Sequence, residues 1–153
     1  MTLTVEHALE LKAYVGQVLG TSGWIAVTQR AIDDFARLSG DDHWIHVDVE
    51  RARGEMPEGR TIAHGLYLLS LVPVLQREIY AIRKRGRGLN YGYDRLRFVA
   101  PVPVGSHIRL RQSLARAAAH AVGTRLEFDE EIEIEGREKP ALVARHILLI
   151  ENP

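Results

Sequence analysis

The chain has 153 residues, and its twenty basic and twenty acidic side chains cancel to a formal net charge of zero. This balance argues against a non-specific nucleic-acid or membrane-surface binder, because such proteins carry a strong positive excess. The absence of cysteine excludes disulfides, zinc–thiolate sites and cysteine nucleophiles. We expect one globular domain over residues 1–153, without a signal peptide or membrane span, in the cytoplasm.

The early part of the chain has mostly helical patterns. Apolar residues between positions 9 and 19 predict a short helix, and Ser22–Val27 is typical of a brief strand. Thr28 can cap a second helix, which is expected to stop at Ser39-Gly40. The segment Asp41–Asp48, dense in His and Asp, predicts a loop with a turn or two of helix.

The longest predicted helix runs from Ala63 to Arg83. Its leucine and valine side chains cover most of its circumference, which is typical of a helix buried on all sides. Pro73 removes one internal hydrogen bond and is expected to bend the helix. Basic residues at its end suit the negative pole of the helix dipole.

The second half has the pattern of antiparallel strands, predicted at Asn90–Phe98, Ser106–Leu114, Leu126–Ile134 and Ala141–Ile150. The third strand alternates apolar and polar residues, although Glu130 interrupts the apolar row, and the last is apolar on both faces, as in a central strand. Helices that precede antiparallel strands indicate the α+β class. We expect an antiparallel sheet of about five strands wrapped round one long buried helix.

Asp41 and His46 are five positions apart in the polar loop. A carboxylate and an imidazole are the usual pair for moving protons near neutral pH, and together they can hold one water molecule. The alternative is a structural role, in which Asp41 caps a turn and His46 packs its ring against the core.

Gly65 lies at the expected start of the long helix. The first N–H groups of a helix have no internal partner and carry partial positive charge, so they can stabilise an oxyanion. Glycine also allows a ligand carbonyl to approach the backbone closely. The alternative reading of Gly65 is close packing of the helix against the sheet.

Three separated segments, Phe35–Asp48, Thr61–Gly65 and Arg97–Gly105, together resemble the MaoC-like hydratases. These are the (R)-specific enoyl-CoA hydratases, and the chain looks closest to their nodulation-protein-N-like branch. The resemblance runs in order from about Thr28 to Val104. It implies a hot-dog fold, usually found as a dimer, and agrees with the architecture expected from periodicity.

The resemblance also implies an activity and its residues. The family's Gly-Asp-x-x-x-x-His motif matches Asp41 and His46, which would bind the catalytic water, and Gly65 would offer its N–H to the thioester oxygen. The implied enzyme is a hydro-lyase that adds water to trans-2-enoyl thioesters of coenzyme A or acyl carrier protein, with no metal or separate cofactor. His43-Trp44 replaces the family's usual Asn-Pro, so a second imidazole lies close by.

Further candidates for substrate binding are a histidine beside the helix start and the cations beyond its predicted end. These residues are His64, Arg83, Lys84, Arg85 and Arg87. The cations could meet the phosphates of the thioester carrier, or they could simply form a solvated helix end.

Three other functions stay open. A hot-dog thioesterase would need a carboxylate on or beside the long helix, and the first acid there is Glu78. A metal site could draw on several residues of the polar loop: Asp41, Asp42, His43, His46 and Asp48. A non-catalytic acyl-CoA-binding protein would bind the thioester without turning it over.

Overall fold

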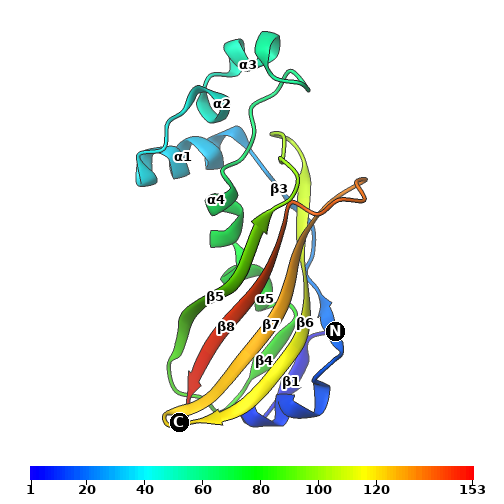
Figure 1. The fold of residues 1–153 in the computed structure, drawn as a ribbon, viewed down its shortest axis with the longest axis vertical. Helices are drawn as coiled ribbons and strands as arrows, with labels where there is room; N and C mark the ends of the chain where they lie inside the picture. Colours follow the sequence, from blue (N-terminus) through cyan, green and yellow to red (C-terminus); the bar gives the residue numbers. More distant parts are fainter.

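The computed structural model describes residues 1–153, and a curved antiparallel sheet of six strands dominates it (Figure 1). The strands are β2 (Val18–Thr21), β3 (Ile25–Ala26), β5 (Gly88–Phe98), β6 (His107–His120), β7 (Gly123–Ile134) and β8 (Leu142–Glu151). Their order is β2-β6-β7-β8-β5, and β3 also pairs with β6. The four strands predicted in the second half are therefore confirmed, and β5 lies at one edge of the sheet.

Two short helices, α4 (Gly65–Ser70) and α5 (Val72–Gln76), follow one another along the sheet. They bury Leu68, Val72 and Leu75 in the main apolar core. A sheet wrapped round a central helical segment is the hot-dog arrangement, so the predicted fold is confirmed. No helix of the chain has the length and apolar character to cross a membrane.

The continuous helix predicted from Ala63 to Arg83 is wrong in two respects. It is interrupted at Leu71, because Pro73 has no N–H for a continuous helix and lies instead in the first turn of α5. It also ends at Gln76, since Tyr80–Ile82 form strand β4, which pairs in parallel with β1 (Leu3–Val5). Alternating apolar side chains suit that strand as well as a helix, and the partner strand decides between them.

The N-terminal elements are shorter than predicted. The expected helix at positions 9–19 is a 3-10 helix, Ala8–Tyr14, because the chain joins the sheet at Val18. The strand expected at Ser22–Val27 is reduced to Ile25–Ala26.

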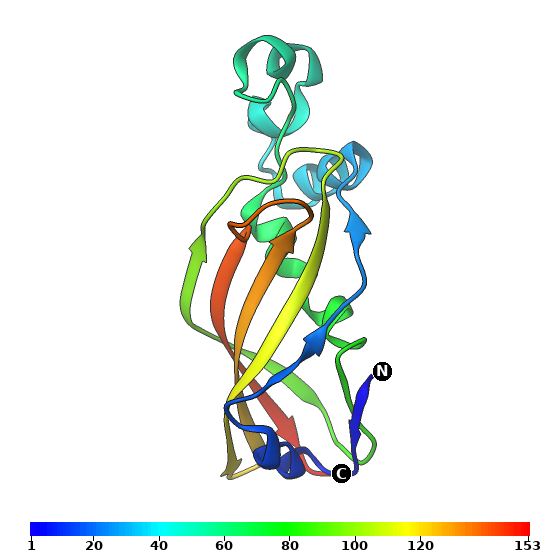
Figure 2. The same ribbon diagram turned by 90° about the vertical axis from the view of Figure 1, so that its right-hand side faces the viewer.

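Three helices project beyond one end of the sheet (Figures 1 and 2): α1 (Gln29–Ser39), α2 (Trp44–Val47) and α3 (Val49–Glu55). The Thr28 hydroxyl accepts the N–H of Ala31 at the start of α1, and Gly40 ends the helix at a φ of 79°. The predicted second helix and the helical turn inside the polar loop are confirmed.

A row of buried polar side chains crosses the sheet face that packs against α5. Glu130 accepts hydrogen bonds from Gln112 (2.7 Å) and from Nδ1 of His146 (2.7 Å). Nε2 of His146 bonds the side-chain oxygen of Asn90 (2.8 Å), and Gln112 also donates to Gln76 of α5 (2.8 Å). Gln112, Glu130 and His146 are each at most 1% exposed, so this network lies inside the core.

Replacing His146 by Leu is expected to lower the free energy of unfolding by about 2–3 kcal/mol, because the buried Glu130 side chain would lose the ring N–H that it accepts. Urea denaturation followed by circular dichroism measures this loss. The double variant E130L/H146L serves as the control and should be more stable than H146L, since it removes both members of the pair. A single variant within about 1 kcal/mol of wild type would contradict a structural role for the pair.

Candidate active site

The polar loop is ordered by caps at the ends of its short helices. Nδ1 of His43 accepts the N–H of Ile45 at the start of α2, and Asp48 accepts the N–H of Arg51 at the start of α3. His43 and Asp48 are therefore engaged by backbone groups, and neither is part of the cluster that forms around Asp41 and His46.

His46 lies on α2 and is 8% exposed. Its Nδ1 lies 2.6 Å from the carbonyl oxygen of Ile62, so Nδ1 carries the proton and donates it. Gln29 of α1 donates to the main-chain carbonyl of His46 (2.8 Å), and the Thr61 hydroxyl donates to Gln29 (2.5 Å). These contacts hold the ring with its Nε2 lone pair free when the ring is neutral.

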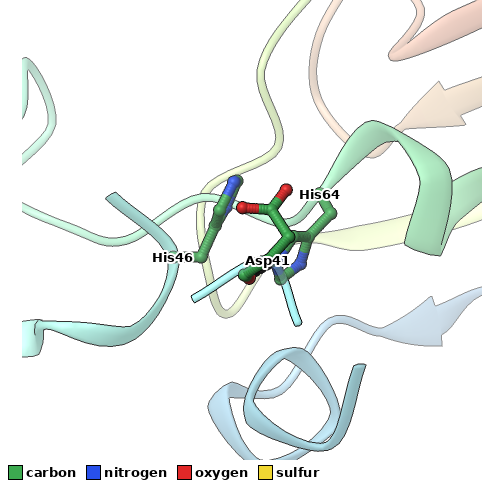
Figure 3. A group of neighbouring side chains, drawn as sticks. All are labelled: Asp41, His46 and His64. Carbon is green, nitrogen blue, oxygen red and sulfur yellow. Dashed lines mark hydrogen bonds between the residues drawn. The ribbon is translucent and has the colours of Figure 1, made fainter. Parts of the chain in front are cut away.

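Asp41, His46 and His64 form one cluster (Figure 3), in which a carboxylate oxygen and one nitrogen of each ring lie within 4.8 Å of one another. The two imidazole rings stack at 3.8 Å between centroids. Nε2 of His64 donates to the main-chain carbonyl of Asp41 (2.8 Å), which ties the loop to the start of α4. The side chains of Asp41 and His46 therefore lie close together in space.

The cluster has acceptors but no matching donors. The carboxylate of Asp41 and Nε2 of neutral His46 both accept hydrogen bonds. Nδ1 of His64 is a third acceptor, which is buried and has no partner in the chain. A water molecule supplies two O–H donors, which match the two acceptors on Asp41 and His46.

The pKa of the His46 imidazole is lowered from its ordinary value. Burial is the largest cause, because it disfavours the charged ring, and the neighbouring His64 and His43 act in the same direction. The hydrogen bond to Ile62 and the Asp41 carboxylate oppose the shift without reversing it. The ring is therefore held neutral at neutral pH, as a general base requires.

Beside the cluster lies an apolar hollow of about 260 Å³, bordered by His46, Gly65, Leu68 and Phe98. The N–H of Gly65, the first of α4, has no backbone acceptor in the chain. A Cβ atom at Gly65 would come within 2.6 Å of the Phe98 ring. Gly65 thus allows the helix start to pack against β5 and leaves its N–H available at the edge of the hollow.

The predicted substrate-binding cations Arg83, Lys84, Arg85 and Arg87 follow β4, at the end of the molecule opposite α2 and this cluster (Figure 1). Arg83 and Lys84 pair with Glu6, and Arg87 makes a two-pronged ion pair with Glu151. Arg85 has no carboxylate within ion-pair distance. Of these neighbouring cations, Arg85 is therefore the one without a carboxylate partner.

The carboxylate that a thioesterase would need is absent from α4 and α5, whose sequences are GLYLLS and VPVLQ. Glu78, the first acid beyond them, accepts the main-chain N–H of Gly23 at 2.7 Å. Its carboxylate is therefore engaged in holding the β2–β3 connection to the turn after α5.

Sequence reasoning missed the residues that position His46. Gln29 and Ile62 contact it from positions 17 and 16 residues away, through a side-chain amide and a main-chain carbonyl. Neither contact has a sequence signature of its own. The one sequence signal for these positioning residues is that Thr61 begins the segment Thr61–Gly65, which resembles the family.

Comparison with known proteins supports a common origin across most of the chain. The model of the MaoC like domain matches residues 10–132. The chain is 42% identical over 146 residues to 3-hydroxyacyl-thioester dehydratase Z of Mycobacterium tuberculosis, covering 95% of this chain and 96% of that protein. It is also 42% identical over 147 residues to nodulation protein N of Rhizobium leguminosarum bv. viciae, covering 93% and 89% of the two chains.

Solved structures share the fold at lower sequence identity. R-hydratase PhaJ1 from Pseudomonas aeruginosa superposes with a TM-score of 0.72 at 19% identity, over 91% of this chain and 83% of that one. One chain of the ChsH1-ChsH2 complex from Mycobacterium tuberculosis superposes with a TM-score of 0.63 at 14% identity, over 91% and 98%. With the family model covering most of its length and relatives this similar, the chain belongs to the MaoC-like domain family.

Proposed function

We propose that the protein is a hydro-lyase that adds water to trans-2-enoyl thioesters and, in reverse, dehydrates 3-hydroxyacyl thioesters. The observation that carries the proposal is the close approach of the Asp41 carboxylate to the His46 imidazole, next to an apolar hollow and a free backbone N–H. The 42% identity to a 3-hydroxyacyl-thioester dehydratase supports the same reaction class. An (R)-configured 3-hydroxyacyl product follows from the family resemblance.

In the proposed reaction, the enoyl group lies in the apolar hollow with its thioester oxygen near the N–H of Gly65. Water held by Asp41 and His46 gives one proton to Nε2 of His46, and its oxygen forms a bond to C3. The C2–C3 π electrons move toward the carbonyl, and the Gly65 N–H stabilises the charge on the thioester oxygen. The pair then returns a proton to C2, so the sum of the steps is addition of one water.

His64 is proposed to position this machinery. Its ring supports the His46 ring by stacking, and its Nε2–H fixes the main chain at Asp41.

The decay of enoyl absorbance in a series of trans-2-enoyl-CoA substrates tests the proposal and measures the preferred chain length. We expect loss of the conjugated double bond without release of free thiol. Thiol release with the double bond retained would establish the thioesterase alternative, and binding with neither change would establish the non-catalytic one. Activity that disappears with a chelator and returns with a metal ion would contradict a proton-only mechanism.

The activity is expected to fall on the acid side with a midpoint below pH 6.5, the ordinary imidazole value. The reason is that the lowered pKa of His46 keeps the ring unprotonated, and able to accept a proton, down to a lower pH. The pH dependence of kcat/KM for an enoyl-CoA measures this midpoint. H64N removes a neighbour that depresses the pKa of His46 and should move the midpoint upward, whereas a wild-type midpoint above 6.5 would contradict the assignment.

A homodimer is the second part of the proposal. The outer edge of β5 has no strand partner in the chain, and apolar side chains beside it are exposed: Leu89 44%, Tyr91 63%, Phe98 50%, Leu66 60% and Val74 51%. An exposed edge of this length and apolar character favours pairing with another strand. Antiparallel pairing of β5 with β5 of a second copy about a two-fold axis would cover both the edge and the helix face.

Sedimentation equilibrium is expected to give twice the chain mass of 17.2 kDa. V74E places a charge in the exposed apolar helix face and should shift the protein toward the monomer. A wild-type monomer at micromolar concentration would contradict the dimer. The carrier of the thioester and the cytoplasmic location stay predictions.

A further inference from the structure

A pocket at the end of α5 remote from the Asp41–His46 pair is lined by cationic and amide side chains and by no acid. This basic pocket has a volume of about 260 Å³, and its polar lining consists of Gln76, Arg77, Arg85, Asn90 and His146. An adjoining hollow of about 230 Å³ shares Gln76, Arg77 and Arg85 with it. The proposed acid–base chemistry uses none of these residues.

The two arginines of the basic pocket are free of carboxylates, unlike the cations around them. Arg83 and Lys84 are paired with Glu6, and Arg87 with Glu151. No such partner lies within ion-pair distance of Arg77 or Arg85. Arg85 makes one hydrogen bond, to the carbonyl of Gly86, and its guanidinium occupies the space that a side chain at position 88 would fill.

The buried polar row sets the orientation of the two amides. The oxygen of Gln76 accepts from Gln112, and the oxygen of Asn90 faces Nε2 of His146. The nitrogen of each amide is therefore left as a donor. Glu130, which can only accept as a carboxylate, anchors both Gln112 and His146 from behind. Two guanidiniums and two amide donors thus surround a pocket without acid, which is the composition of an oxyanion-binding site.

Within one chain, the basic pocket and the apolar hollow lie at opposite ends of the α4–α5 segment, since Gly65 borders the hollow and Gln76 borders the basic pocket. The hollow adjoins the Phe98 end of β5, and the basic pocket adjoins the Gly88 end. Antiparallel pairing of β5 with its copy places the Phe98 end of one strand beside the Gly88 end of the other. A two-fold axis near the middle of β5 would therefore bring the basic pocket of one chain beside the hollow of its partner.

We propose that Arg77 and Arg85 of one chain, with Gln76 and Asn90, bind a phosphate of the thioester carrier whose enoyl group is processed by Asp41 and His46 of the other chain. This inference rests on the proposed function and dimer. The phosphate could belong to coenzyme A or to the phosphopantetheine of an acyl carrier protein, since both attach the thioester through the same pantetheine arm. The apolar hollow of the chain that supplies Asp41 and His46 then binds the acyl chain. The thioester carrier extends across the dimer interface to the basic pocket of the other chain.

The ratio of kcat/KM for an enoyl-CoA to that for the phosphate-free enoyl-pantetheine tests the pocket. R77A/R85A is expected to lower this ratio by about 10–100-fold, because charge-assisted contacts to phosphate are lost. R83A/K84A removes two neighbouring charges that Glu6 already engages, and we expect a much smaller change. An unchanged ratio in R77A/R85A would overturn the proposal.

Enoyl-phosphopantetheine identifies the phosphate. If R77A/R85A lowers kcat/KM, relative to enoyl-pantetheine, for enoyl-phosphopantetheine as well as for enoyl-CoA, the pocket binds the pantetheine phosphate. If it lowers the ratio for enoyl-CoA alone, the pocket binds a nucleotide phosphate. Both outcomes support the pocket. Failure of the wild type to hydrate enoyl-pantetheine and enoyl-CoA alike would instead refute the proposed function.

A heterodimer isolated with two affinity tags tests whether the basic pocket of one chain serves the active site of the other. One chain carries R77A/R85A, and the other carries D41N. If the pocket serves the partner's site, one of the two sites is intact, and the heterodimer should show about half the wild-type kcat/KM for enoyl-CoA. A heterodimer no more active than the R77A/R85A homodimer would overturn the assignment to opposite chains.

Discussion

Replacing Asp41 by Asn is expected to lower kcat for hydration of a trans-2-enoyl-CoA by about 10²–10⁴-fold, the usual effect of losing a positioned acid–base group. Asn keeps the size of the side chain but loses its negative charge, so it cannot stabilise the protonated His46 that forms when the water gives up its proton. The link from Asp41 to His64 passes through the main-chain carbonyl and survives the change. A steady-state enoyl-CoA hydration assay and a thermal melt separate activity from stability.

The matched control is D42N, which removes the adjacent exposed carboxylate outside the cluster and should keep near wild-type activity. H46Q should lose as much as D41N. The double variant D41N/H46Q should be little worse than either single one, since both groups act on one water molecule. A D41N enzyme that kept most of its activity would refute the proposed roles.

Replacing Gly65 by Ala is expected to reduce kcat/KM by about 10²–10³-fold, similar to the loss of an oxyanion-hole donor. The new Cβ would lie 2.6 Å from the Phe98 ring, closer than van der Waals contact allows. The half-exposed ring must then swing into the hollow or push the start of α4 away from β5. Either movement displaces the Gly65 N–H from the position of the thioester oxygen.

The double variant G65A/F98A distinguishes the two causes. Removing the ring gives the Cβ room, so recovery of activity would assign the loss to displacement by Phe98. Continued loss would assign it to the methyl group standing between the substrate carbonyl and the N–H. A G65A enzyme as active as wild type, with an unchanged melting temperature, would remove Gly65 from the proposed mechanism.

Local patterns predicted the parts of the fold that depend on neighbours in sequence. Alternation of apolar residues predicted β6 and β7, an apolar run on both faces predicted β8, and a capping Thr28 with a terminal Gly40 predicted α1. Asp41 and His46 could be predicted as a pair because one short loop carries both. The charged Glu130 in the apolar row of β7 also has its explanation, since this residue lies at the centre of a buried polar network.

Long-range contacts account for what local patterns could not reveal. His64 enters the cluster from 23 residues beyond Asp41, and Gln29 reaches His46 from another helix. Arg83 and Arg87 find their acids 77 and 64 residues away, which leaves Arg85 free although it lies between them. The segment after Gln76 becomes a strand only because β1 pairs with it. Residue type and spacing thus predicted α1, the four long strands and the nearness of Asp41 to His46. The folded chain alone selected the ends of the other elements and each side chain's partner, because hydrogen bonds and ion pairs depend on distance in space.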